Sequence, residues 1–200
     1  MLRAVCLDLM GVLLYDPYLE ALEAATATDV ATAHRLKDPD CWPEFEVAAI
    51  DEAEFARRFF AGRDGMRFDL DAFHRVRLAG YRFLPGMDEL LDHLDGAVAR
   101  YVASNYPVWI EELRVRFGLD RRCEGIYASH QLGVRKPDPD FYRRLLEAVR
   151  LPPPTCLFVD DREVNCAAAE AAGLRAHVFA DAVDLRRRLR VEGVSLVEPA

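Results

Sequence analysis

One aspartate interrupts the apolar run near the N-terminus of this 200-residue chain. In the stretch LRAVCLDLMGVLLYD, residues 2–16, Asp8 is followed by Met10 and Gly11. A carboxylate inside a buried strand costs several kcal/mol unless a cation or a donor pairs with it. We therefore expect Asp8 at the exposed end of a strand, where it faces a cation or a reagent. A carboxylate in that position can act as a nucleophile, because a covalent intermediate divides one difficult displacement into two easier ones.

Three later stretches carry groups of complementary chemistry. They are Ser104-Asn105 after AVARYVA, Lys136 in GVRKPDPDFY, and the pair Asp160-Asp161 after TCLFV. A hydroxyl and an ammonium group can bind phosphoryl oxygens, and adjacent carboxylates suit a hard divalent cation. Asp160 followed by Glu163 also fits a helix capping box, but capping needs only one of the two aspartates.

Strand-like and helical stretches alternate along most of the chain, which predicts an α/β fold with a parallel, doubly wound sheet. The expected strands cover residues 2–9, 97–104, 125–129, 155–159 and 174–179. Ligands of such sheets bind at the carboxyl ends of the strands. Asp8, Ser104 and the Asp160-Asp161 pair lie at or just beyond these ends, so we expect residues far apart in the sequence to converge on one edge.

Residues 17–80 have a helical pattern and contain no convincing strand. Apolar residues recur at spacings of three and four, and Asp51, with either Asp69 or Asp71, is a predicted helix N-cap. Aromatic residues at helical spacing predict the interior of this segment: Trp42, Phe45, Phe55, Phe59 and Phe60. We therefore predict an α/β core formed by residues 1–16 and 81–200, with a small all-helical insert formed by residues 17–80.

In this order, the four polar stretches resemble the motifs of the haloacid dehalogenase (HAD) superfamily of phosphohydrolases. The resemblance spans residues 2–179 and implies a Rossmann-like core whose active site is covered by a helical cap of the first type, here the insert. The contexts SN, RKPDP and FVDDREVN are most similar to the branch that contains the N-terminal phosphatase domain of soluble epoxide hydrolases. The resemblance implies hydrolysis of small phosphorylated metabolites through an aspartyl-phosphate on Asp8.

The resemblance also implies a role for each polar residue. Asp8 and Asp161 would bind Mg²⁺ directly, the backbone carbonyl of Met10 would be a third ligand, and Asp160 would hold a bound water or Lys136. Ser104, Asn105 and Lys136 would bind the phosphate, although Asn105 also fits a local turn or packing role. Three carboxylates against one divalent cation and Lys136 give a total charge of about zero, and oxygen ligands favour Mg²⁺ over softer metals.

Met10 departs from the family pattern, since the phosphatases usually carry a second aspartate at this position. That aspartate protonates the leaving oxygen and then activates water, and such general acid-base steps are worth about 10² to 10⁴ in rate. A thioether cannot transfer a proton. We therefore expect a hydrolase restricted to good leaving groups, such as acyl, aryl or anomeric phosphates, with water activated by Tyr15, Asp16 or a residue of the cap.

Two other functions fit the same residues. The chain can be a HAD fold that binds a phosphorylated ligand or a protein partner with little or no turnover. It can also be a 2-haloacid dehalogenase, which attacks carbon and carries a tyrosine at the position of Met10. Dehalogenation is disfavoured because it needs no metal, so the Asp160-Asp161 pair would lie uncompensated beside an anionic substrate.

Composition limits the classes of partner. The chain has 26 Lys and Arg residues against 34 Asp and Glu, a net charge of −8, which argues against nucleic acids and anionic membranes. No apolar segment reaches the roughly 18 residues that a membrane span needs. The five cysteines show no CxxC spacing, and the N-terminus lacks the pattern of a signal peptide. We expect a cytoplasmic monomer or homodimer that acts on a small phosphorylated molecule.

Overall fold

The computed structural model describes residues 1–63 and 65–196. Residue 64 of the predicted insert and residues 197–200 of the predicted core lie outside the described residues. The strands are β1 (Ala4–Leu7), β2 (Ala99–Ser104), β3 (Gly125–Ala128), β4 (Cys156–Asp160) and β5 (Arg175–Val178). They form one sheet in the order β3-β2-β1-β4-β5, with every neighbouring pair parallel. The predicted parallel, doubly wound sheet is confirmed.

The central strand β1 explains where the polar residues come together. All four of its residues are buried, as expected for a continuous apolar strand covered on both faces. Ala4 pairs with Ala99 of β2 on one side and with Cys156 of β4 on the other. The strand order reverses at β1, and a sheet of this kind has its binding crevice at that point.

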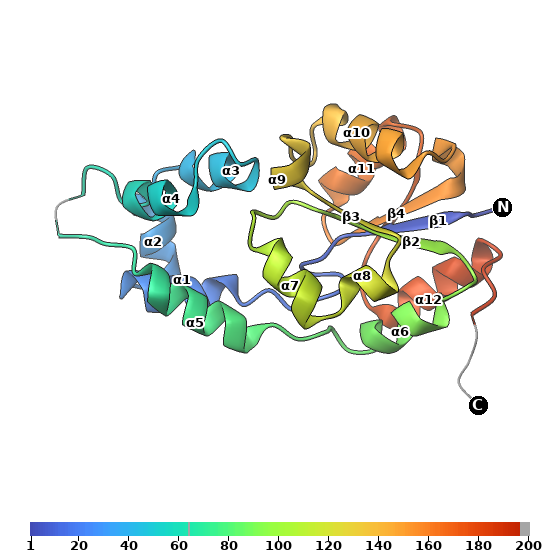
Figure 1. The fold of residues 1–200 in the computed structure, drawn as a ribbon, viewed down its shortest axis with the longest axis horizontal. Coiled ribbons are helices and arrows are strands. Elements are labelled where there is room, and N and C mark those ends of the chain that lie inside the picture. The colour runs from blue at the N-terminus through green and yellow to red at the C-terminus, as the bar shows by residue number, and fades with distance from the viewer. Residues whose placement is uncertain (64, 197–200) are drawn as a thin grey trace.

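Helices cover both faces of the sheet (Figure 1). One layer consists of α6 (Met87–His93), α7 (Ile110–Arg116), α8 (Leu119–Arg122) and α12 (Ala182–Val191), and the other of α9 (Ser129–Leu132), α10 (Pro139–Val149) and α11 (Glu163–Ala171). A short 3-10 turn, η1 (Pro153–Thr155), precedes β4. Alternate side chains of β1 enter the two layers, because Val5 and Leu7 belong to one hydrophobic cluster and Ala4 and Cys6 to the other.

Five helices follow β1 and lie beyond the carboxyl end of the strands (Figure 1). They are α1 (Tyr18–Thr26), α2 (Val30–Leu36), α3 (Cys41–Glu46), α4 (Glu52–Arg58) and α5 (Leu70–Gly80). The side chain of Asp51 accepts a hydrogen bond from the backbone N–H of Glu54 at 2.8 Å, and Asp69 accepts one from Ala72 at 2.9 Å. Both residues are therefore N-caps, whereas Asp71 lies in the first turn of α5. We refer to residues 17–80 as the insert; its exact boundaries stay a prediction.

Aromatic side chains form the interior of the insert and pack it against the sheet and its covering helices, which we call the sheet domain. Phe45, Phe55, Phe59 and Phe60 are buried, as predicted. Trp109, which precedes α7, lies with its ring centroid 4.9 Å from that of Phe45 and belongs to the same hydrophobic cluster as Val5 and Leu7 of β1. The apolar interior is therefore continuous from the insert to the sheet. The five cysteines are all buried and free.

Candidate functional site

Four predicted site residues gather at the carboxyl edge of the sheet. Asp8 directly follows β1, Ser104 ends β2, Asp160 ends β4 and Asp161 comes next. One carboxylate oxygen from each of the three aspartates lies within 4.8 Å of the others. The convergence expected from the strand ends is therefore present in the structure.

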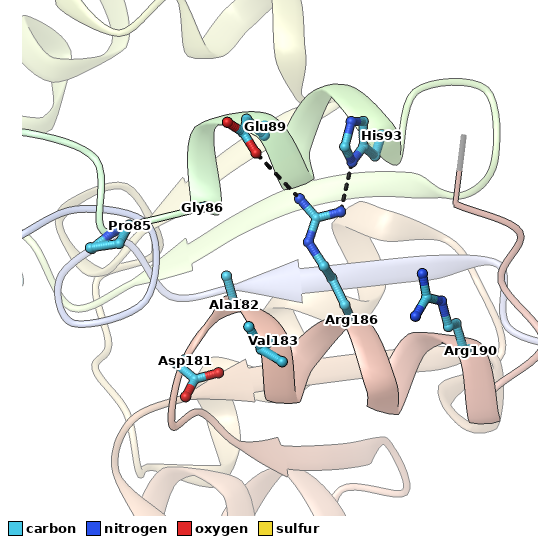
Figure 2. Close-up of a pocket in the computed structure, with 9 residues that line it drawn as sticks. All are labelled: Pro85, Gly86, Glu89, His93, Asp181, Ala182, Val183, Arg186 and Arg190. Atoms are coloured by element: carbon cyan, nitrogen blue, oxygen red, sulfur yellow. Dashed lines mark hydrogen bonds and ion pairs between the residues drawn. The ribbon is translucent and has the colours of Figure 1, made fainter. Parts of the chain in front are cut away.

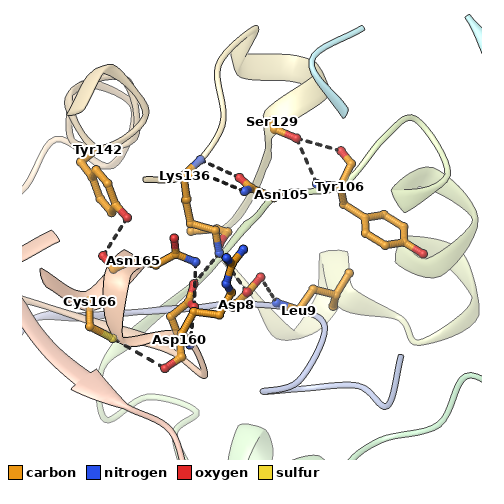
Figure 3. Close-up of polar contacts among 12 residues, drawn as sticks. Asp8, Leu9, Asn105, Tyr106, Ser129, Lys136, Tyr142, Asp160, Asn165 and Cys166 are labelled. Atoms are coloured by element: carbon orange, nitrogen blue, oxygen red, sulfur yellow. Dashed lines mark hydrogen bonds and ion pairs between the residues drawn. The ribbon is translucent and has the colours of Figure 1, made fainter. Parts of the chain in front are cut away.

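Lys136 joins this group from the loop before α10 (Figure 3). Only 1% of the residue is exposed, and its Nζ lies 2.9 Å from Oδ2 of Asp8 and 2.6 Å from Oδ2 of Asp160. The same ammonium donates a hydrogen bond to the carbonyl of Ala103 at 3.0 Å. The Asn105 side chain accepts from the backbone N–H of Lys136 at 2.7 Å and donates to its carbonyl at 2.9 Å. Asn105 therefore positions the lysine.

Asp160 is fastened on its other oxygen as well. Its Oδ1 accepts hydrogen bonds from the backbone N–H of Arg162 and from Nδ2 of Asn165, both at 2.9 Å. Asp160 is not the N-cap of α11, because Arg162 occupies that position and makes no side-chain cap. The capping alternative for Asp160 is therefore wrong, and the carboxylate instead holds Lys136. Asp161 is exposed at the same edge.

Burial and charge together set the protonation of the cluster. Burial raises the pKa of Asp8 to about 6, although the Lys136 ammonium opposes this rise. Burial also tends to raise the pKa of Asp160, but the Lys136 ammonium outweighs this effect and holds that pKa below its usual range. The two carboxylates raise the pKa of Lys136 despite its burial, so the ammonium stays charged. Three carboxylates with one ammonium leave two negative charges, which one divalent cation would balance.

The donor set fits Mg²⁺. Its ligands would be carboxylate oxygens, and the two uncompensated charges match a hard divalent ion. Gly11 makes room for this arrangement: it has a φ of +79°, and a Cβ there would lie 2.8 Å from Oδ2 of Asp161. Asp8 and Asp161, with Asp160 beside them, are the residues that would hold the ion. A ligand role for the Met10 carbonyl stays a prediction.

Two cavities open beside the aspartates and share four lining residues. The first, of about 240 Å³, is lined mostly by charged and polar side chains: Asp8, Met10, Gly11, Asp16, Glu46, Asn105, Arg135, Lys136, Asp161, Arg162 and Asn165. The second, of about 250 Å³, is lined by Met10, Asp16, Tyr18, His34, Lys37, Trp42, Glu46, Asn105 and Tyr106. A charged cavity thus continues into one with aromatic walls. We call them the charged cavity and the aromatic cavity.

The remaining predicted residues lie at different depths. Ser104 is buried, and its hydroxyl acts on the Asp8 carboxylate by lowering its pKa. The hydroxyl of Tyr15 bonds to Glu20, whereas Asp16 lines both cavities. Glu46 and Arg135 are cavity residues that sequence reasoning did not single out. Glu46 lies in an ordinary helical pattern and Arg135 beside the motif lysine, so only their places in the fold mark them.

A wider depression lies elsewhere, between α6 and α12 (Figure 2). It has a volume of about 840 Å³ and is lined by Pro85, Gly86, Glu89, His93, Asp181, Ala182, Val183, Arg186 and Arg190. Arg186 contacts Nδ1 of His93 at 2.6 Å and Glu89 at 4.0 Å across it. None of these residues belongs to the aspartate cluster, so the depression is not part of the candidate site.

Residues 2–173 match the family model of haloacid dehalogenase-like hydrolases. The chain belongs to this family. A flavin mononucleotide hydrolase of Arabidopsis thaliana is 33% identical to this HAD-like hydrolase over 193 residues, which cover 96% of this chain and 78% of the relative. A sesquiterpene phosphatase of Aspergillus oryzae is 27% identical over 178 residues, covering 86% and 87% of the two chains.

The fold of this HAD-like hydrolase also matches solved structures. A HAD family enzyme of Bacteroides thetaiotaomicron, in complex with magnesium and inorganic phosphate, has a TM-score of 0.76 and 19% sequence identity, covering 91% of this chain and 96% of the other. The resemblance to the HAD superfamily is confirmed; the closer likeness to the epoxide hydrolase branch stays a prediction. Among the described residues, no helix has the length and apolarity needed to cross a membrane.

Proposed function

We propose that this HAD-like hydrolase cleaves phosphate monoesters of small organic molecules in a Mg²⁺-dependent reaction. The observation that carries the proposal is the cluster of Asp8, Asp160 and Asp161. One carboxylate oxygen of each lies within 4.8 Å of the others, and with Lys136 the cluster keeps two uncompensated negative charges. A bound Mg²⁺ would neutralise charge on the phosphoryl group and orient it. The Mg²⁺-phosphate complex of the Bacteroides relative supports this choice of ion.

In the proposed reaction, an oxygen of Asp8 attacks phosphorus and forms an aspartyl-phosphate, which water then hydrolyses. Lys136 keeps Asp8 ionised and aimed, since its Nζ lies 2.9 Å from the carboxylate. Lys136 and Arg135 both line the charged cavity and would bind phosphoryl oxygens, with Ser104 supporting Asp8. The charged cavity would therefore hold the phosphate, and the aromatic cavity would hold the organic group.

Flavin mononucleotide is the first substrate to test. The Arabidopsis relative is named for its hydrolysis, and its planar ring system suits a cavity whose walls include Trp42, Tyr18 and Tyr106. This ester has an alkyl leaving group, which needs a proton as it departs. Aryl and acyl phosphates have leaving groups that need no such proton. An enzyme with Met10 in place of the proton-donating aspartate should therefore hydrolyse them most readily.

The test measures release of inorganic phosphate from flavin mononucleotide, an aryl phosphate and an acyl phosphate, with Mg²⁺ and with a chelator. We expect Mg²⁺-dependent release that Asp8→Asn abolishes, because an amide cannot attack phosphorus. Asp71→Asn changes an exposed aspartate of α5 and serves as the matched control. Absence of turnover on all three compounds, combined with tight binding of a phosphorylated compound, would instead identify a binding protein.

A further inference from the structure

Glu46 is a buried carboxylate that the insert places against the catalytic edge. It ends α3, is 4% exposed, and lines both the charged and the aromatic cavity. Its Oε1 accepts a hydrogen bond from Nε1 of Trp42 at 2.7 Å, and its backbone carbonyl accepts one from Oγ of Ser129 at 2.6 Å. Ser129 begins α9 of the sheet domain, so the position of Glu46 is fixed from both sides.

The second oxygen of Glu46 is not satisfied in the same way. Oε2 lies 2.7 Å from Nη2 of Arg135, which is close enough for an ion pair. The orientation does not meet the geometry of a hydrogen bond, and this buried oxygen has no hydrogen-bond partner among the described residues. A buried polar atom without a hydrogen bond is costly to a fold. Because the residue Glu46 lines both cavities, this oxygen has hydrogen-bonding capacity left for a ligand or a reacting molecule.

We propose that Glu46 is the proton donor and acceptor that this HAD-like hydrolase uses in place of the aspartate missing at Met10. The inference rests on the proposed phosphatase function and adds the group that would transfer the proton. Glu46 and Met10 line the same two cavities, so a carboxylate from the insert borders the same spaces as the residue that replaces the family's second aspartate. Oε2, whose ion pair with Arg135 is not a hydrogen bond, is the oxygen that would carry the proton.

The proposed steps balance without a further reagent. Asp8 attacks phosphorus, the bond from phosphorus to the leaving oxygen breaks, and protonated Glu46 gives its proton to that oxygen, which leaves as an alcohol. The Glu46 carboxylate then takes a proton from water as the water oxygen attacks the aspartyl-phosphate. The bond from phosphorus to Asp8 breaks, which restores the Asp8 carboxylate, releases phosphate and leaves Glu46 protonated again.

The electrostatic surroundings of Glu46 suit both halves of this cycle. Burial raises the pKa of its carboxyl to about 7, Arg135, Trp42 and Lys136 oppose the rise, and the charge of Asp8 adds to it. A group with a pKa near the working pH is an effective acid in one step and an effective base in the next. The same chemistry would be inefficient for an exposed glutamate with an ordinary pKa.

Asp16 is the competing carboxylate, because it also lines both cavities. Its Oδ1 accepts a hydrogen bond from the backbone N–H of Tyr18 at 3.0 Å, and the residue is exposed. Glu46 is favoured for two reasons. Hydrogen bonds hold both its side-chain Oε1 and its backbone carbonyl, and its Oε2 has no hydrogen-bond partner among the described residues. The experiment includes Asp16→Asn so that the two carboxylates can be told apart.

The test compares Glu46→Gln with the wild type on flavin mononucleotide and on p-nitrophenyl phosphate. We expect kcat/KM for the alkyl ester to fall by about 10² to 10⁴, because its leaving oxygen needs the proton. For p-nitrophenyl phosphate kcat/KM should hold within about twofold, while kcat falls and a rapid burst of nitrophenolate appears, since hydrolysis of the aspartyl-phosphate becomes limiting. Glu23→Gln, an exposed residue of α1, is the matched control.

A second variant separates proton transfer from support of the fold. Adding Met10→Asp to Glu46→Gln should restore most of the activity on the alkyl ester if Glu46 transfers the proton. A merely structural role for Glu46 predicts no recovery. Equal loss of kcat/KM on both esters, or full activity in Glu46→Gln with loss in Asp16→Asn, would overturn the inference and leave the phosphatase function standing. An inactive wild type would overturn both.

Discussion

Lys136 shows how one buried cation organises the site at the scale of single residues. Its ammonium bridges Asp8 and Asp160 at 2.9 and 2.6 Å in an almost fully buried setting. Removing one partner of a buried ion pair costs about 3 to 5 kcal/mol, because the remaining charge loses its compensation. The lysine therefore contributes to folding as well as to the proposed chemistry. Glu46 differs from Lys136 because its ion pair with Arg135 does not have the geometry of a hydrogen bond.

Glu46 should also leave a signature in the pH dependence of stability. Its pKa is about 7 in the fold against 4.5 for the free group. The folded state therefore holds this proton more tightly, and the resulting stability is complete below pH 4.5 and is lost as the pH rises to about 7. Glutamine does not titrate. In metal-free protein, the free energy of unfolding of Glu46→Gln should rise relative to wild type across this range, by at most about 3 kcal/mol.

Urea unfolding of both proteins at several pH values measures this difference. Glu23→Gln again provides the control, because it replaces an exposed glutamate of α1 that lines neither cavity. A difference between Glu46→Gln and wild type that stays constant with pH would contradict the prediction.

At the scale of elements, the turn after β1 determines how closely β4 can approach. Gly11 adopts a φ of +79°, and Asp161, which follows β4, lies where a side chain at residue 11 would begin. The turn is held by hydrogen bonds from the backbone N–H of Gly11 to the carbonyl of Leu14 and from that of Leu13 to the carbonyl of Leu9, at 2.9 and 3.0 Å. Glycine is thus required for its backbone freedom and for its lack of a Cβ.

Gly11→Ala should weaken Mg²⁺ binding more than it weakens the fold. The added Cβ would lie 2.8 Å from Oδ2 of Asp161, so this carboxylate must move. Gly65→Ala is a matched control, since Gly65 has a φ of +77° and no atom within 4 Å of the position of a Cβ. Both variants should lose stability through backbone strain. Only Gly11→Ala should reduce Mg²⁺ affinity, measured by calorimetric titration; equal effects on affinity would refute the steric argument.

At the scale of the whole molecule, the insert covers the carboxyl edge of the sheet and is joined to it by polar as well as apolar contacts. Arg77 of α5 forms an ion pair with Glu112 of α7 at 2.7 Å, and Nε1 of Trp109 bonds to Glu52 of α4. These contacts add to the continuous aromatic interior. The aspartate cluster thus sits between two parts of the chain, and ion binding there should stabilise the fold as a unit.

Mg²⁺ should therefore raise the melting temperature of the protein. An ion present at 100 times its dissociation constant adds about 2.7 kcal/mol to the free energy of unfolding. Asp161→Asn should remove this response. The same change should raise the stability of the metal-free protein, because partial burial of this otherwise exposed carboxylate and the charge of Asp160 raise the pKa of Asp161 and disfavour its ionised form. Thermal unfolding with Mg²⁺ or a chelator tests both signs, and a full Mg²⁺ response in Asp161→Asn would exclude it as a ligand.

The sequence by itself determined the sheet, its parallel strands and the edge where Asp8, Ser104, Asp160 and Asp161 meet. These features follow from local rules, since a continuous apolar run makes a buried strand and polar residues at its end mark the binding edge. The aromatic interior of the insert followed from helical spacing and the N-cap Asp51 from its capping pattern, whereas the choice of Asp69 over Asp71 came from the structure.

Only the tertiary structure decided which residues of the insert reach the site. The place of Glu46 depends on the packing of α3 against α9 and on its contacts with Ser129 and Arg135, which are distant in the sequence and lie outside α3. The close approach of Gly11 to Asp161 likewise depends on two loops at once. Such long-range packing cannot be predicted from the periodicity of the sequence, because a helix has the same apolar spacing whichever element it packs against.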